Sequence, residues 1–462
     1  MTPHAADSPV RLRQLECFSV HRSRLGLYTN VCVTGTYRAS NPQDDLKSDL
    51  YRAAGSVVAR HPALSVGLLL SPDGSDTAPP AFVRLPEMDL DQMITVTQHG
   101  NPAGLPPRSV EEAAAERLEA QHNTPFDLAS QPAPLWRLAV LDDRAGSGRV
   151  SICFCFHHSI MDTKSALVFH EDLLDSLLRL EPNEPPPAIT RGSVEPLLPP
   201  MEALNPLPVS EEYIQRCLAS RKPGDEVWSG NPQVVPVKTR ISFFWLPSAD
   251  SQTLRRRCKE HGSSPTALIM AAMASAMFAK LPDRYTTLVG DCAVSVRHLM
   301  PAPVTARSMG CYVGTFTETY SRPAASGTES ESLRADSQRT KATIVATLAS
   351  RCAECPIGLL NRIADVGGFF SAKLGHKRWG AFELSNVGTL EDTTPAPDGS
   401  RYDLESLLFS QSAGATSPVL KISVASGKDG RLGFGFSWQQ GVVEDDLIIE
   451  VIAAFKRTLL DI

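Results

Sequence analysis

A proline-dense segment, EPNEPPPAITRGSVEPLLPPMEALNPLPV, occupies residues 181–209 of this 462-residue chain. Proline fixes φ and cannot donate a backbone hydrogen bond, so neither a helix nor an inner strand of a sheet runs easily through such a segment. The composition therefore favours an extended connector between two separately packed parts. We predict two domains, at residues 1–185 and 226–462, joined by a crossover linker over residues 186–225.

Strand-like and helix-like patterns alternate on both sides of this segment. Residues 28–39 and 150–156 have the apolar content and alternation of buried strands, whereas residues 45–64 and 110–123 have helical spacing. After the proline-dense segment, residues 419–443 predict a hairpin that turns at GKDGR. The predicted fold class is therefore α/β with mixed sheets.

Composition excludes several classes of protein. The chain is 42% hydrophobic and carries a net charge of -6, which favours a large core and argues against a nucleic-acid partner. The longest apolar run, residues 267–279, is too short for a membrane span and predicts a buried helix. The first residues contain no apolar signal-peptide core, and the ten cysteines are scattered, so we expect a cytoplasmic protein with reduced thiols and no metal.

The sequence HHSIMD, residues 157–162, follows the apolar strand and precedes a helical pattern from about Lys164. Three roles are open to the two histidines. They can be half-buried structural residues, with Asp162 as the cap of the following helix. They can ligate a metal, although no third ligand motif is present. One of them can act as a general base at the mouth of a cleft.

HHSIMD resembles the HHxxxD signature of the chloramphenicol acetyltransferase-like superfamily. This group includes the plant BAHD acyltransferases, the condensation domains of peptide synthetases and the fungal alcohol acetyltransferase-like enzymes. Other stretches resemble the family in the same order, at residues 123–141 and 291–314. ELSNVGTL (383–390) and GFSWQQGVV (435–443) are most similar to the alcohol acetyltransferase branch.

The resemblance implies two similarly built domains, each a mixed sheet flanked by helices, with an active-site tunnel between them. Acyl-CoA would enter from one mouth and the acceptor from the other. His158 would be the general base, and His157 would support it. Asp162 would pair with Arg297 and shape the loop. No covalent acyl-enzyme is required, so none of the cysteines needs to be a nucleophile.

Four further residues are candidates for contact with the substrates. Ser385 and Asn386 match a family motif at the domain interface, although Ser, Asn and Gly also favour plain turns. Trp379, followed by Gly380, faintly resembles a DFGWG stretch of the plant members. Thr163 replaces the glycine that usually follows the motif aspartate, and we expect its side chain to border the acyl-donor channel.

The expected activity is O-acyl transfer, with acetyl-CoA as co-substrate, to the hydroxyl of a small molecule in fungal secondary metabolism. The protein is expected to be a monomer. N-acylation of an amine is chemically similar and stays open. So do a stand-alone condensation-like enzyme that uses carrier-protein-bound acyl groups, and a non-catalytic binding protein of the same fold.

Overall fold

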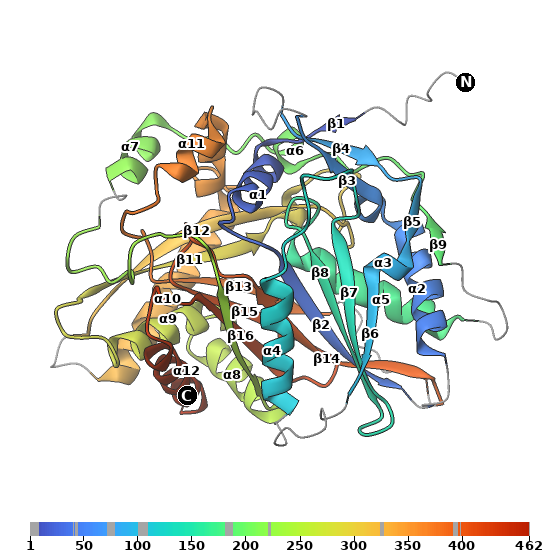
Figure 1. The fold of residues 1–462 in the computed structure, drawn as a ribbon. Helices are drawn as coiled ribbons and strands as arrows, with labels where there is room; N and C mark the ends of the chain where they lie inside the picture. Colours follow the sequence, from blue (N-terminus) through green and yellow to red (C-terminus); the bar gives the residue numbers. More distant parts are fainter. Residues whose placement is uncertain are drawn as a thin grey trace.

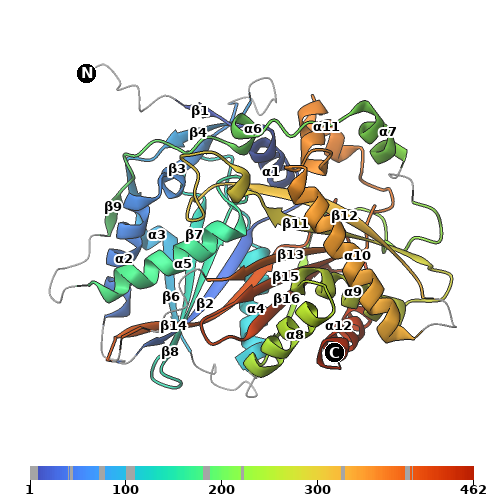
Figure 2. The same ribbon diagram turned by 180° about the vertical axis from the view of Figure 1, so that it is seen from behind.

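The computed structural model describes residues 9–39, 41, 45–71, 79–99, 110–180, 188–219, 223–323, 328–390, 396–397 and 399–461. Two mixed sheets lie side by side, each covered by helices (Figures 1 and 2). No helix in these ranges is both long and apolar enough to cross a membrane.

The first sheet is built mainly from the first half of the chain. Its five strands, in spatial order, are β14 (Tyr402–Gln411), β2 (Val31–Ala39), β8 (Arg149–Phe156), β7 (Trp136–Asp143) and β6 (Ile94–Gln98). The helices of this half are α1 (Gln14–Arg24), α2 (Leu46–Arg60), α3 (Leu90–Met93), α4 (Val110–His122) and α5 (Thr163–Leu178). The edge strand β14 comes from the second half and pairs antiparallel with β2.

The second sheet has six strands and a core of its own. In spatial order they are β10 (Thr239–Leu246), β16 (Leu432–Gln439), β15 (Leu420–Ser426), β13 (Phe382–Thr389), β11 (Thr287–Ser295) and β12 (Val313–Ser321). Its helices are α8 (Ser248–Glu260), α9 (Pro265–Phe278), α10 (Glu329–Ala349), α11 (Val366–Ser371) and α12 (Asp445–Leu460). Helix α9 is buried between α10 and α12, as its continuous apolar run predicts.

The two sheets approach each other closely where β14 meets β16. Gly433 and Gly435 face the backbone of β14, and a Cβ at either position would collide with the carbonyl oxygen of Leu407 or Phe409. Helix α4 contacts β2 of the first sheet and β10 of the second, and Figure 1 shows it between the two sheets. The halves are therefore joined by a shared strand, by close backbone packing and by a bridging helix.

The remaining elements are short. They are β1 (Val10–Arg11), β3 (Val66–Leu69), β4 (Ala81–Arg84), β5 (Glu87–Asp89), β9 (Ile189–Arg191), α6 (Met201–Leu204), α7 (Glu211–Ala219), and the 3-10 helices η2 (Pro62–Ser65), η3 (Arg297–Leu299) and η4 (Pro356–Arg362).

The proline-dense segment packs more than its composition suggests. Its first seven residues lie outside the described ranges, but β9 pairs with β5, and Met201 and Leu207 are buried. This part of the segment is therefore packed as well as extended, and the linker bounds of 186–225 stay a prediction. The prolines are tolerated because none lies within β9 and Pro200 precedes the short helix α6. The domain boundaries stay a prediction. Strand β14 belongs to the second half of the chain but pairs with β2 in the first sheet, so the two halves do not separate cleanly.

Candidate active site

The predicted strand-to-helix junction is present in the structure. Strand β8 ends at Phe156, the two histidines follow, and Asp162 is the N-cap of α5, where its carboxylate accepts a hydrogen bond from the Ser165 amide. A short polar side chain at this position satisfies an amide that the helix itself leaves unpaired. The loop of 157–162 is thereby held between a buried strand and a capped helix.

His158 is fixed in one tautomer. Its Nδ1 lies 3.1 Å from the carbonyl oxygen of Met161, and because that oxygen can only accept, Nδ1 carries the hydrogen. Burial lowers the pKa of His158 to about 4, and the positive charge of Arg22 acts in the same direction. At neutral pH the imidazole is therefore uncharged, and its Nε2 carries a lone pair that can accept a proton.

His157 has a different environment. It is 1% exposed, its Nδ1 accepts a hydrogen bond from the Ser159 amide at 3.2 Å, and its ring packs edge-on against Phe126. Burial lowers the pKa of His157 to about 3. This histidine lies behind the loop, where it orders the backbone that carries His158.

Asp162 and Arg297 form the predicted ion pair. The guanidinium donates from Nη1 to Oδ2 at 2.7 Å and from Nη2 to Oδ1 at 2.8 Å, with both side chains buried. The Tyr312 amide also donates to Oδ2, at 2.9 Å. Burial alone raises the pKa of Asp162, but the charge and hydrogen bonds of Arg297 outweigh it, and the pKa is lowered. The pair connects the histidine loop to η3, which follows β11 in the second half.

A cavity of about 1420 Å³ opens at the His158 side chain. Strands β11, β12 and β13 and helices α1, α11 and η4 contribute to its wall. Of the residues singled out in the sequence, six line it: His158, Asp162, Thr163, Trp379, Ser385 and Asn386. His157 and Arg297 lie behind this wall. A cavity of this size accommodates a small-molecule substrate together with part of a second one.

The predicted substrate-contact residues differ in whether their polar groups already form hydrogen bonds within the protein. Asn386 donates from Nδ2 to the Thr266 hydroxyl at 3.1 Å and accepts from the Gly388 amide at 3.0 Å, so its amide is committed to the protein. Ser385 makes no hydrogen bond with the described residues, and its hydroxyl is available. Thr163 is the first residue of α5 and is buried at the cavity wall.

Five residues near the cavity were not singled out in the sequence. Arg22 and Tyr28 come from α1 and the loop after it, and Asp291, Glu383 and Lys421 lie in register on β11, β13 and β15. Lys421 donates to Glu383 at 2.7 Å, and its Nζ lies 5.0 Å from the centre of the Tyr28 ring. Asp291, Glu383 and Lys421 are each the single charged residue of an otherwise uncharged strand. This pattern was the sequence signal that could have identified them.

The buried histidines predict a loss of stability in acid. Burial depresses the pKa of four of them to about 3 or 4, namely His122, His157, His158 and His170. Below their ordinary pKa of 6.5 the unfolded chain binds these protons and the folded chain does not. Burial raises the pKa of two carboxyls in the folded chain, that of Glu16 to about 7 and that of Asp291 to about 8.

As the pH falls from 6.5 to 5, the unfolded state rises from about two to about four protons on these groups while the folded state stays near two, so the imbalance grows toward two protons and favours unfolding. Two protons correspond to about 3 kcal/mol per pH unit. We expect the melting temperature to fall markedly from pH 6.5 to pH 5, measured by circular dichroism in one mixed buffer at constant ionic strength. A melting temperature that is constant or rises over this range contradicts the expectation.

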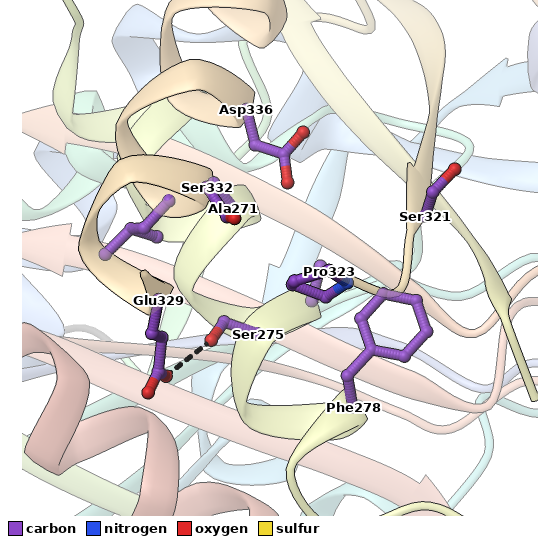
Figure 3. A pocket seen from close by; sticks show the side chains of 10 residues that line it. Ala271, Ser275, Phe278, Ser321, Pro323, Glu329, Ser332 and Asp336 are labelled. Carbon is purple, nitrogen blue, oxygen red and sulfur yellow. Dashed lines mark hydrogen bonds between the residues drawn. The ribbon is translucent and has the colours of Figure 1, made fainter. Parts of the chain in front are cut away.

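The structure gives little support to two other kinds of site, a second pocket and a metal site. A hollow between α9 and α10 measures only about 10 Å³, the space of a single water, and the Ser275 hydroxyl donates to Glu329 beside it at 2.8 Å (Figure 3). Within the described ranges, no three His, Cys, Asp or Glu side chains are grouped to hold a metal ion.

A family model and two relatives are similar to this chain over most of its length. The family model described as "Alcohol acetyltransferase" matches residues 111–188 and 222–459. The chain is 28% identical to "Probable alcohol acetyltransferase crmB" of Aspergillus fumigatus, over 95% of this chain and 96% of that protein. It is 25% identical to "Probable alcohol acetyltransferase FCK4" of Fusarium pseudograminearum, over 92% and 89%.

A solved structure shares the fold. The trichothecene 15-O-acetyltransferase TRI3 of Fusarium sporotrichioides superposes with a TM-score of 0.74 at 14% identity, covering 99% of this chain and 97% of that one. The family model spans more than half of the sequence, so this chain belongs to the alcohol acetyltransferase family of acyltransferases.

Proposed function

We propose that the protein is an acetyl-CoA-dependent O-acetyltransferase that acts on the hydroxyl of a small-molecule acceptor, with His158 as general base. The observation that carries the proposal is the state of His158 at the cavity wall. Its Nδ1–H is held by the Met161 carbonyl, and burial keeps the ring neutral, so Nε2 is available as a proton acceptor. The family membership supplies the reaction class.

The reaction needs one proton acceptor and no covalent enzyme intermediate. Nε2 of His158 takes the proton of the acceptor hydroxyl as its oxygen attacks the thioester carbonyl. A C–O bond forms, and the carbonyl oxygen becomes an oxyanion, toward which the free hydroxyl of Ser385 is a candidate donor. Collapse of the tetrahedral intermediate breaks the C–S bond, and the departing thiolate takes the proton from the imidazolium.

Acetyl-CoA is the co-substrate in this proposal. The cavity wall contains the basic side chains Lys164 and Lys373, which suit a phosphorylated donor. Asp162 and Arg297 act as positioning residues, since neither is needed for proton transfer and together they fix the loop that carries His158.

The proposal is tested by product formation from free substrates. The purified protein is incubated with acetyl-CoA and panels of small alcohols and amines, while free thiol and the mass of the acetylated product are followed. Acetyl esters from alcohols support the proposal, and products from amines alone would make the enzyme an N-acetyltransferase. Activity only with an acetylated carrier protein, or ligand binding without any turnover, contradicts it.

The position of Thr163 yields a prediction about donor choice. Thr163→Gly removes a side chain from the cavity wall at the first turn of α5, so longer acyl-CoAs should gain activity relative to acetyl-CoA, while kcat for acetyl-CoA is retained. The free energy of unfolding should fall by about 0.5–1 kcal/mol because glycine adds backbone freedom to the unfolded chain. Thr163→Ala is the control that removes the side chain without that entropic cost. An acyl-CoA profile identical to wild type in both variants shows that residue 163 does not border the donor.

A further inference from the structure

Helix α1 presents one face to the cavity. Leu15, Phe18, Ser19 and Arg22 all line it, and their spacing of three and four residues places them on a single side of the helix. The helix packs beside η4 and α11 of the second half, and Figures 1 and 2 show α1 next to α11. Arg22, in its last turn, therefore faces the cavity.

The guanidinium of Arg22 has no polar partner in the described part of the chain. Its Cζ lies 4.8 Å from the centre of the Phe18 ring and 4.4 Å from that of Tyr28, so aromatic rings hold it in place. Nε is buried without a hydrogen bond, whereas neither Nη nitrogen is among the buried polar atoms that lack a partner. A stacked guanidinium keeps its in-plane N–H donors free for a planar anion. Burial disfavours the charge of this half-buried guanidinium, and an anionic partner would offset that cost.

The neighbouring charges compensate Arg22 only in part, since the carboxylate of Glu383 acts on it but is hydrogen-bonded to Lys421. Lys421 also contacts the Tyr28 ring, but its charge is balanced by Glu383 at 2.7 Å. Asp291 lies beside Glu383 in register, and burial raises the pKa of its carboxyl to about 8, so it is mostly uncharged at neutral pH. This part of the cavity therefore has an excess of positive charge.

The position of Arg22 indicates which substrate would supply the anion. Tyr28 contacts Arg22 on one side, and its ring centre lies 6.2 Å from that of His158. Both the guanidinium and the His158 ring therefore lie close to Tyr28, and the charge of Arg22 acts on His158. The long pantetheine arm of acetyl-CoA keeps its phosphates far from the thioester, and the acetyl group itself is neutral. The complementary anion must then belong to the acceptor.

We propose that the acceptor is an alcohol that also carries a carboxylate, which Arg22 holds while the hydroxyl faces His158. This specificity rests on the proposed function, because it takes His158 as the centre of reaction. A bidentate guanidinium–carboxylate contact at a half-buried arginine is stronger than a contact with the matching neutral ester, by about 10–100-fold in affinity.

The test uses matched ligands and matched variants. 4-(Hydroxymethyl)benzoate and its methyl ester are titrated into the full-length protein by calorimetry, and wild type should bind the acid at least about 10-fold more tightly. Arg22→Met should abolish this preference, and Arg22→Lys should keep part of it. Arg24→Met, an exposed arginine of the same helix, is the control and should behave as wild type. Melting temperatures establish that each variant is folded.

Acetyl transfer to the same two acceptors separates the two proposals. If neither is acetylated but the Arg22-dependent preference for the acid persists in binding, the proposed function fails and the role of Arg22 stands. The proposal for Arg22 is overturned if the ester binds wild type as tightly as the acid, or if Arg22→Met keeps the preference. It is also overturned if Arg22→Met lowers kcat for both acceptors equally, which would place Arg22 at the reaction centre.

Discussion

Replacing His158 by alanine should lower kcat by about 10²–10⁴-fold while the protein stays folded. The substitution removes an imidazole at the cavity wall whose tautomer the Met161 carbonyl fixes and whose Nε2 can therefore accept a proton. Its fold should survive, because the side chain is partly exposed and contributes one hydrogen bond to the Met161 carbonyl. Steady-state kinetics with acetyl-CoA and a saturating acceptor measure the loss.

Two further alanine variants show whether the loss of rate is specific to His158. His157→Ala should cost less in rate and more in stability, because His157 is buried and does not reach the cavity. His99→Ala, at an exposed position, should change neither. Near wild-type turnover of His158→Ala would refute general-base catalysis by this residue. An equal loss of rate in the His157 and His158 variants would show that the loop, and not a single base, is needed.

The ion pair between Asp162 and Arg297 should dominate the stability of the site. Removing either partner strands the other charge in the protein interior, and the free energy of unfolding should fall by about 3–5 kcal/mol in each single variant. Asp162→Ala also removes the cap of α5 and the acceptor of the Tyr312 amide. Both variants should lose activity as well, since the loop that carries His158 is no longer fixed.

A double-mutant cycle measures the coupling directly. Asp162→Ala, Arg297→Met and the double variant are unfolded in urea, and the double variant should be less destabilised than the sum of the two single ones. A coupling energy of at least about 1 kcal/mol is expected for a buried pair with two direct hydrogen bonds. Strict additivity would mean that the two side chains do not stabilise each other.

Local sequence patterns predicted the histidine junction well. A strand that ends in two histidines, followed by a capping aspartate and a helical pattern, is determined by neighbours in the sequence, and β8, the loop and α5 lie where expected. The resemblance to a known superfamily added what local patterns cannot give, namely that Asp162 meets Arg297 far along the chain. The superfamily and the alcohol acetyltransferase branch are both confirmed by the family match.

The surroundings of His158 were harder to predict because they depend on long-range contacts. Arg22 lies in HRSRLG, which reads as a polar helix end, and only the packing of α1 against the second half turns its side chain into the cavity. Likewise, the sequence of β14 does not specify its partner. A strand of alternating residues carries no sign of which sheet it will join.

The shared strand has a consequence for how the chain acquires its structure during synthesis. Strand β2 ends at Ala39, but its edge partner β14 begins only at Tyr402 and so leaves the ribosome about 20–70 s later at the usual rate of translation. Until then, β2 presents unpaired amides and carbonyls that can recruit other chains. A pairing so distant in sequence also forms slowly because of its loop-closure entropy. Ribosome-bound chains that end before residue 402 should therefore need chaperones, and an isolated first half should aggregate unless residues 402–411 are added to it.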